Sequence, residues 1–161
     1  MLLLRSASRG VRGGSGSTVV PLRKRPRPFS TAPRPPRLLL VWHSRTGLAR
    51  AMSDEMEGGA RAVAAEMESE LAVERREARD ATIDDLLGAD GYLLAAPENL
   101  ASVSGEMKEF FDRNYYHAFA TTGTREGEEY EEVSRLLGRP YGLAIAAGSD
   151  GTGAARQVER I

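Results

Sequence analysis

The chain has 161 residues, a length typical of one domain, and its lack of cysteine excludes disulfides, thiolate metal sites and a cysteine nucleophile. The formal net charge of -1 is unevenly spread, because residues 1–37 hold eight arginines, one lysine and no acidic residue, which leaves 13 basic against 23 acidic residues afterwards. This acidic body, with a net charge of about -10, argues against nucleic-acid binding. The sequence contains no apolar run of about 18 residues, the length that would predict a membrane span.

The N-terminal arm, residues 1–36, is predicted to be a disordered basic segment, because its arginine-, proline- and glycine-rich sequence buries too little apolar surface to offset the entropy of ordering. It contains serine and no acid, as organelle transit peptides do. The run from Arg27 to Ser30 is similar to a mitochondrial processing site. Mitochondrial targeting is therefore expected. The alternatives are a plastid address, or a cytoplasmic protein with a misassigned start and a generic basic tail.

Strand patterns recur through the rest of the chain. Three continuous apolar runs predict strands that are buried on both faces. They cover residues 37–42, 91–96 and 141–147. Pro97 is expected to end the second of these strands. Leu71 and Val73 alternate with polar residues ahead of a charged run, which predicts a weaker strand at an edge of the sheet.

Helical spacing of apolar residues predicts the connecting helices. They cover residues 48–67, 84–87, 105–117, about 130–137, and 154 onward. The alternation predicts an α/β fold in three layers, a doubly wound parallel sheet with helices on both faces. With the half-polar strand at the edge, the strand order is 2-1-3-4. A sheet of this type has a fifth strand, and no pattern for it follows residue 147, so the domain at 37–161 is expected to be C-terminally incomplete.

The loop after the first buried strand, residues 43–49, is rich in hydroxyl groups and opens a helix. Helix N-termini with free backbone N–H groups bind phosphate well, the hydroxyls of Ser44 and Thr46 can donate to it, and Arg45 adds positive charge. The alternative is an ordinary helix cap, made by Ser44 or Thr46.

Two more loops follow the other buried strands. In the loop at 97–104, Asn99 and free backbone groups can bind the edge of a heterocycle, unless the loop is only a connection capped by Ser102 or Ser104. The loop at 147–153 has three glycines, which either let the backbone approach a flat ligand closely or form a flexible turn. Since loops after parallel strands meet at one edge of the sheet, all three are expected to converge into one site.

Other chemistries are weakly supported. The glycine pattern of a hydrolase nucleophile elbow is missing around Ser44. The two histidines, His43 and His117, are far apart in sequence, and His43 at a strand end is expected to be structural rather than a general base. Metal ligands at convincing spacing are lacking as well.

Taken together, residues 39–47, 97–113 and 147–153 resemble the flavodoxin-like superfamily, in particular its NADPH-dependent FMN reductase or NAD(P)H:quinone oxidoreductase-like branch. The resemblance covers about 37–161. It implies a flavodoxin-like fold, FMN as cofactor, NAD(P)H as co-substrate, a small-molecule electron acceptor such as a quinone or flavin, and a homodimer or homotetramer. No catalytic side chain is expected, because the flavin performs the electron chemistry.

The resemblance also implies which residues contact FMN. Around the phosphate they are Ser44, Thr46, Gly47, Leu48 and Ala49, with charge added by Arg45. Along the isoalloxazine ring and ribityl chain they are Pro97, Glu98, Asn99 and Leu100. On the other side of the ring they are Gly148, Asp150, Gly151 and Gly153. The family usually has a hydroxyl pair at the positions of Leu48 and Ala49, so one donor is lost, worth about 1–2 kcal/mol.

Two functions of other classes remain open. A flavodoxin-type electron carrier would have no nicotinamide-dependent activity, and its acidic body would favour docking on basic redox partners. A cofactor-free interaction module would use the fold without a flavin.

Overall fold

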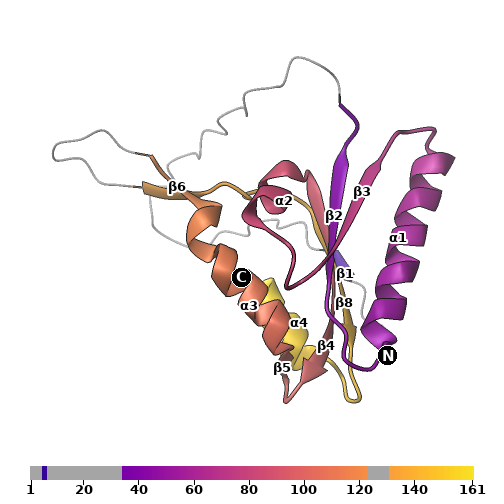
Figure 1. Cartoon of the computed structure of the whole chain (residues 1–161), viewed down its shortest axis with the longest axis vertical. Helices are drawn as coiled ribbons and strands as arrows, with labels where there is room; N and C mark the ends of the chain where they lie inside the picture. The colour runs from indigo at the N-terminus through magenta and orange to yellow at the C-terminus, as the bar shows by residue number, and fades with distance from the viewer. Residues whose placement is uncertain (1–4, 7–33, 123–130) are drawn as a thin grey trace, which may run out of the picture.

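The computed structural model describes residues 5–6, 34–122 and 131–161 (Figure 1). The pattern from Arg27 to Ser30 lies outside these ranges, so the transit peptide stays a prediction. Within the arm, Arg5–Ser6 form β1, which pairs antiparallel with the outer edge of β8 (Tyr141–Ala146).

The main sheet has four parallel strands in the order β3-β2-β4-β8, with β1 added beside β8. The remaining strands of this sheet are β2 (Arg37–Trp42), β3 (Ala72–Glu77), β4 (Gly91–Asn99) and the short β5 (Ser102–Val103), which pairs with the end of β4. When these four predicted strands are numbered 1 to 4 along the chain, their order across the parallel sheet is 2-1-3-4. The doubly wound, flavodoxin-like architecture is therefore confirmed.

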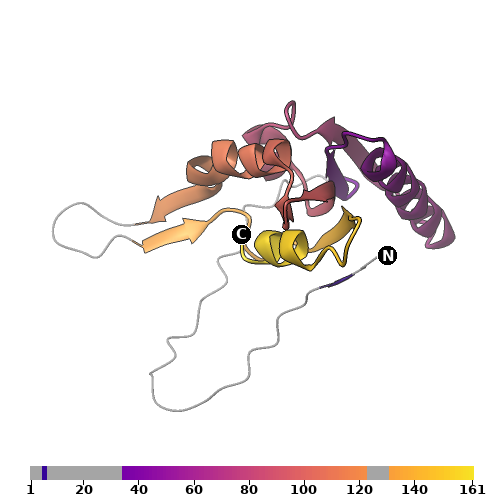
Figure 2. The same ribbon diagram turned by 90° about the horizontal axis from the view of Figure 1, so that it is seen from below.

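Helices cover both faces of the sheet, as Figures 1 and 2 show. Their bounds are α1 (Leu48–Glu66), α2 (Ile83–Gly88), α3 (Gly105–Tyr115), the 3-10 helix η1 (Tyr116–Ala118) and α4 (Thr152–Glu159). α1 lies on one face, whereas α2, α3 and α4 lie on the other. Among the described residues, none of these helices combines the length and apolar character needed to cross a bilayer.

The centre of the fold is β2, which is hydrogen-bonded on both edges and buried on both faces. Leu39, Leu40 and Val41 have no exposed surface. Leu39 and Val41 belong to the core cluster with α3 and α4, and alternation along a strand turns Leu40 toward α1. The continuous apolar run therefore predicted the right kind of strand.

Pro97 does not end β4, contrary to the sequence prediction. The Ala95 carbonyl faces β2, because it accepts a hydrogen bond from the His43 N–H at 3.0 Å. Pro97 lies two residues further along and faces the same side, beyond the end of β2, so no ladder hydrogen bond needs its missing N–H. On the other edge, pairing with β8 continues as far as Pro97 opposite Ala146.

The predicted helix near 130–137 is also wrong. Phe119–Thr122 and Glu131–Ser134 form β6 and β7, an antiparallel hairpin that projects from the body (Figure 1). Residues 123–130, between these strands, lie outside the described residues. Cross-strand pairing with β6 engages one edge of residues 131–134, and such tertiary pairing overrides local helical propensity.

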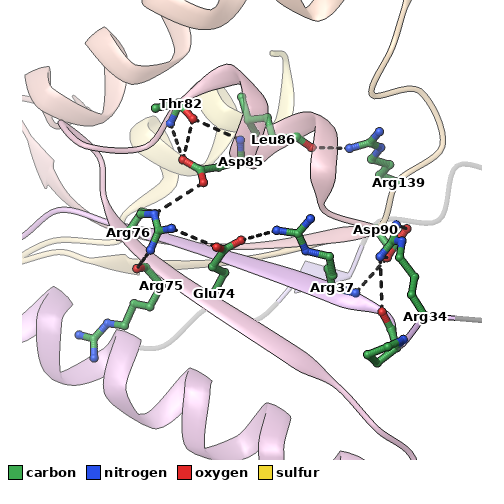
Figure 3. Close-up of polar contacts among 11 residues, drawn as sticks. Arg34, Arg37, Glu74, Arg75, Arg76, Thr82, Asp85, Leu86, Asp90 and Arg139 are labelled. Atoms are coloured by element: carbon green, nitrogen blue, oxygen red, sulfur yellow. Dashed lines mark hydrogen bonds and ion pairs between the residues drawn. The ribbon is translucent and has the colours of Figure 1, made fainter.

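The edge strand β3 continues through the charged run that was expected to follow it. Figure 3 shows how the charges are paired: the Glu74 carboxylate accepts hydrogen bonds from Arg37 at 2.8 Å and from Arg76 at 3.0 Å. Arg76 also lies 3.6 Å from Asp85, whose carboxylate completes the capping box of α2 with Thr82. These ionic contacts let a polar strand pair along β2, and its charges protect the sheet edge.

Two methionines offer a matched test of this packing. Met107 of α3 is 1 % exposed in the core, whereas Met67, just after α1, is 71 % exposed. Met107→Ala is expected to lower the free energy of unfolding by about 3 kcal/mol, because it leaves a cavity. Met67→Ala should change it by less than about 0.5 kcal/mol. Urea denaturation measures both values, and equal losses would contradict the core described here.

Candidate functional site

Three loops leave the carboxyl edge of the sheet and meet there (Figure 1). The first loop (43–49) follows β2, the second loop (97–104) begins within the end of β4, and the third loop (147–153) follows β8. Side-chain hydrogen bonds join the first loop to the second and the second to the third. The predicted convergence is therefore present in the structure.

In the first loop, a glycine sets the entry to α1. Gly47 is the N-cap residue, with a φ of 95° in the left-handed region that favours glycine. The Ser44 hydroxyl accepts a hydrogen bond from the Gly47 N–H at 3.0 Å. No side chain caps the first turn of α1, and this turn contains no acidic residue. The 19-residue helix thus presents its N-terminal N–H groups without a bound carboxylate, and the alternative of an ordinary side-chain cap is not observed.

The other residues of the first loop divide between solvent and core. Arg45 and Thr46 are exposed, and neither makes a side-chain hydrogen bond or ion pair within the described part of the chain. Leu48 is exposed, whereas Ala49 is buried. Leu48 and Ala49 can therefore offer an anion only their backbone N–H groups, while the side chains of Arg45 and Thr46 are available to it.

The second loop is a tight hairpin between β4 and β5. Asn99 pairs with Ser102, so Leu100 and Ala101 are the two central residues of the turn. Both have positive φ, 53° and 57°, a conformation that costs non-glycine residues about 1–3 kcal/mol each. The side chain of Leu100 is fully exposed. This strained turn places an apolar side chain in solvent at the site.

The third loop is held to the second by Glu98. One carboxylate oxygen accepts from the Ser149 hydroxyl at 2.9 Å, and the other accepts from the Ala154 N–H at 3.1 Å. The side chain of Glu98, expected along the flavin, is thus engaged with the third loop and the start of α4. A carboxylate therefore lies at the N-terminus of α4, and the first turn of α3 contains the acidic Glu106, so at this edge α1 is the helix whose N-terminus has no acidic group beside it.

Within the third loop, Asp150 stabilises the turn. Its carboxylate accepts a hydrogen bond from the Thr152 N–H at 2.9 Å, which lowers the pKa of Asp150 below its ordinary value of 3.8. Gly151 has a φ of 70° and is the N-cap residue of α4. Gly148 has open space where a side chain would begin.

Gly153 shows why a glycine is needed where the second and third loops touch. A Cβ there would lie 2.2 Å from the carbonyl oxygen of Ala101. The neighbouring Gln157 of α4 accepts hydrogen bonds from the Ser102 hydroxyl and the Val103 N–H, at 2.6 and 2.9 Å. Sequence reasoning missed Ala101 and Gln157, because neither carries a local signal for a contact between distant loops.

His43 joins the first loop to the second. Its Nδ1 lies 2.8 Å from the Ser104 hydroxyl, and its Nε2 lies 3.4 Å from a carboxylate oxygen of Glu106. Both His43 and Ser104 are buried, with Ser104 fully so. In the described residues, no group of three or more acidic or histidine side chains is placed to hold a metal ion.

Comparison with known proteins gives a consistent picture. Residues 45–160 match the model of a family described as having a flavodoxin-like fold. A curated protein of Aquifex aeolicus (strain VF5) called flavodoxin is 33 % identical over 76 residues, which are 47 % of this chain and 38 % of that protein. The chain thus spans well under half the length of this relative.

Two solved structures are similar over part of the chain. One is a flavodoxin from the domain Archaea, with 18 % identity and a TM-score of 0.41, and the other is the Streptococcus pneumonia TIGR4 flavodoxin, with 22 % identity and a TM-score of 0.40. Each match covers 47 % of this chain and 49 % of the other.

The role of Glu98 in joining the loops can be measured by hydrogen exchange. Glu98→Ala removes the acceptor of the Ala154 N–H and is expected to lower the free energy of opening at this amide by about 1–2 kcal/mol. Ser149→Ala removes only the hydroxyl contact and should have a smaller effect at Ala154. Unchanged protection of Ala154 in Glu98→Ala would show that the carboxylate does not hold the third loop.

Proposed function

The chain belongs to the family with a flavodoxin-like fold whose model matches residues 45–160, and on that premise we propose that it binds FMN at the carboxyl edge of the sheet and transfers electrons through it. The observation that carries the proposal is the meeting of the three loops around an open helix N-terminus, that of α1. When bound, FMN supplies the electron and hydride chemistry, so the protein contributes binding, orientation and electrostatics.

The first loop fits the phosphate of FMN. A phosphate needs donors and positive potential, and the N–H groups of Leu48 and Ala49 supply both at the start of a 19-residue helix. Thr46 and Arg45 add an exposed hydroxyl and an exposed guanidinium group. Of the other helices that begin at this edge, α4 already holds the carboxylate of Glu98 at its N-terminus, and α3 has the acidic Glu106 in its first turn. A phosphorylated ligand is therefore favoured at α1.

The second and third loops fit a flat heterocycle. Leu100 offers an exposed apolar side chain to a ring face, and Asn99 offers an exposed amide and backbone groups to a ring edge. Gly148 lets the third loop lie close to such a ring. Glu98 contributes by fixing the separation of these two loops rather than by touching the ring.

The proposal extends to NAD(P)H as the electron donor and to a quinone, a flavin or a similar small molecule as the acceptor. Its support is the sequence resemblance to NADPH-dependent FMN reductases. We also propose a mitochondrial location, from the composition of the arm. The same resemblance supports a homodimer or homotetramer. A second candidate, an electron carrier without nicotinamide-dependent activity, is favoured by the acidic body and by the relative called flavodoxin.

FMN titration tests the phosphate site directly. The protein should quench the fluorescence of added FMN and bind it more tightly than riboflavin, which lacks the phosphate. Thr46→Val keeps the shape of the side chain but removes the hydroxyl, and is expected to weaken FMN binding about five- to thirtyfold. Riboflavin binding should be unchanged in the same variant. Equal losses for the two flavins would place the phosphate elsewhere.

Stopped-flow mixing with NADPH separates the two candidate functions. If the FMN-loaded protein is an oxidoreductase, the flavin absorbance near about 450 nm should bleach within seconds, because hydride transfer from a stacked nicotinamide is direct. Mixing with dithionite is the control that shows the bound flavin to be reducible. Bleaching by dithionite but not by NADPH over minutes would leave the electron carrier as the function.

A further inference from the structure

A buried hydrogen bond between His43 and Ser104 connects the first and second loops, with the half-exposed Glu106 beside the imidazole, and the proposed function gives this group no role. His43 is the first residue after β2, directly before Ser44, and Ser104 precedes the first turn of α3. The two side chains meet at 2.8 Å, while Glu106 lies on the other side of the imidazole at 3.4 Å. The arrangement thus runs from the first loop, through one ring, to the start of α3.

The burial of Ser104 assigns the proton on the imidazole. A buried hydroxyl must donate its proton to an acceptor, and within the described residues the Nδ1 of His43 is the partner of the Ser104 hydroxyl. With Nδ1 as the acceptor, the neutral ring is expected to carry its proton on Nε2. This N–H faces the carboxylate of Glu106. Each of the three groups has a complementary neighbour.

We propose that His43 is a positioning residue that fixes the first loop against the second, so that one FMN molecule can contact both. This inference rests on the proposed function. The bond to the buried Ser104 hydroxyl sets the separation of the loops, and the Glu106 carboxylate, 3.4 Å from Nε2, favours a proton on that nitrogen. The ring is buried and its Nδ1 is bonded to Ser104, so the effect of His43 on the flavin passes through the loops.

A fixed separation of the two loops should strengthen the binding only of a ligand that contacts both loops. FMN would bind the first loop by its phosphate and the second loop by its ring, and a fixed separation lets the second contact form within the same complex. Riboflavin would use only the ring contacts. Loosening the link should therefore reduce the advantage of FMN over riboflavin, whereas a general loss of stability would weaken both ligands together.

The test compares the ratio of the riboflavin Kd to the FMN Kd in the full chain. His43→Leu fills the space without an acceptor, and Ser104→Ala removes the donor; each is expected to lower the ratio about tenfold. His43→Asn keeps an acceptor near the position of Nδ1 and should retain more of the ratio than His43→Leu. His117→Leu, in η1 at the other end of α3, is the matched control and should leave the ratio unchanged.

Imidazole nitrogen NMR adds a readout that does not depend on flavin. The chain has two histidines, so the His117→Leu protein shows the His43 ring alone. The spectrum of the neutral ring should show its proton on Nε2. A proton on Nδ1 would overturn the assignment.

The outcomes distinguish the inference from the function on which it rests. If the wild-type chain binds FMN more tightly than riboflavin, and the two His43 variants and Ser104→Ala all keep that ratio, the positioning role is wrong and the flavin site stands. If the wild-type chain binds the two flavins equally, or binds neither, the phosphate site fails and the inference fails with it. If Ser104→Ala lowers the ratio, the result supports the link even where His43→Leu does not fold.

Discussion

The burial of β2 on both faces and its pairing on both edges constrain everything else in this molecule. A strand of this kind cannot be followed by a hairpin, because both neighbouring positions are occupied by parallel strands. The chain must leave at the carboxyl end and return through a helix, first along one face and then along the other. The loops after β2, β4 and β8 are thus forced to the same edge of the sheet, where the chain crosses from α1 on one face to α3 and α4 on the other.

Polar side chains turn that edge into a site. Glu98 binds the third loop with both carboxylate oxygens, and His43 connects the first loop to the second through the hydroxyl of Ser104. The His43–Ser104 contact is buried and Glu98 is half-buried, whereas Ser149 is exposed, so a lost partner is most costly at His43 and Ser104. The strained turn at Leu100 and Ala101 is held within the same arrangement, since Ala101 packs directly against Gly153. A strained turn of this kind persists only where contacts with its surroundings hold the backbone in that conformation.

Sequence patterns predicted the sheet well because its central strands are buried on both faces. The apolar runs located β2 and β8 to within a residue, and the helical spacing located α1. The failures occur where pairing with distant residues decides the structure. Pro97 stays in β4 because β2 has already ended, and residues 131–134 form a strand because β6 lies beside them. Neither fact is visible in the local sequence.

The candidate site was predictable in outline for the same reason. The positions of the loops follow from the parallel topology, so their convergence could be predicted before any contact was known. Individual roles could not be predicted: Glu98 was expected along a flavin but binds the third loop, and Ser104 was considered only as a helix cap. Side chains of this type depend on the register between distant segments, which composition and spacing do not carry.

The central claim is that three separate loops form one site for FMN, and amide chemical shifts measured with and without FMN test it most directly. The largest shifts on adding FMN are predicted in residues 43–49, 97–104 and 147–153 together, with those of Gly47, Leu48 and Ala49 absent when riboflavin is used instead. Shifts confined to one loop, shifts centred on the outer surface of α3 and α4, or no shifts at saturating FMN would contradict it.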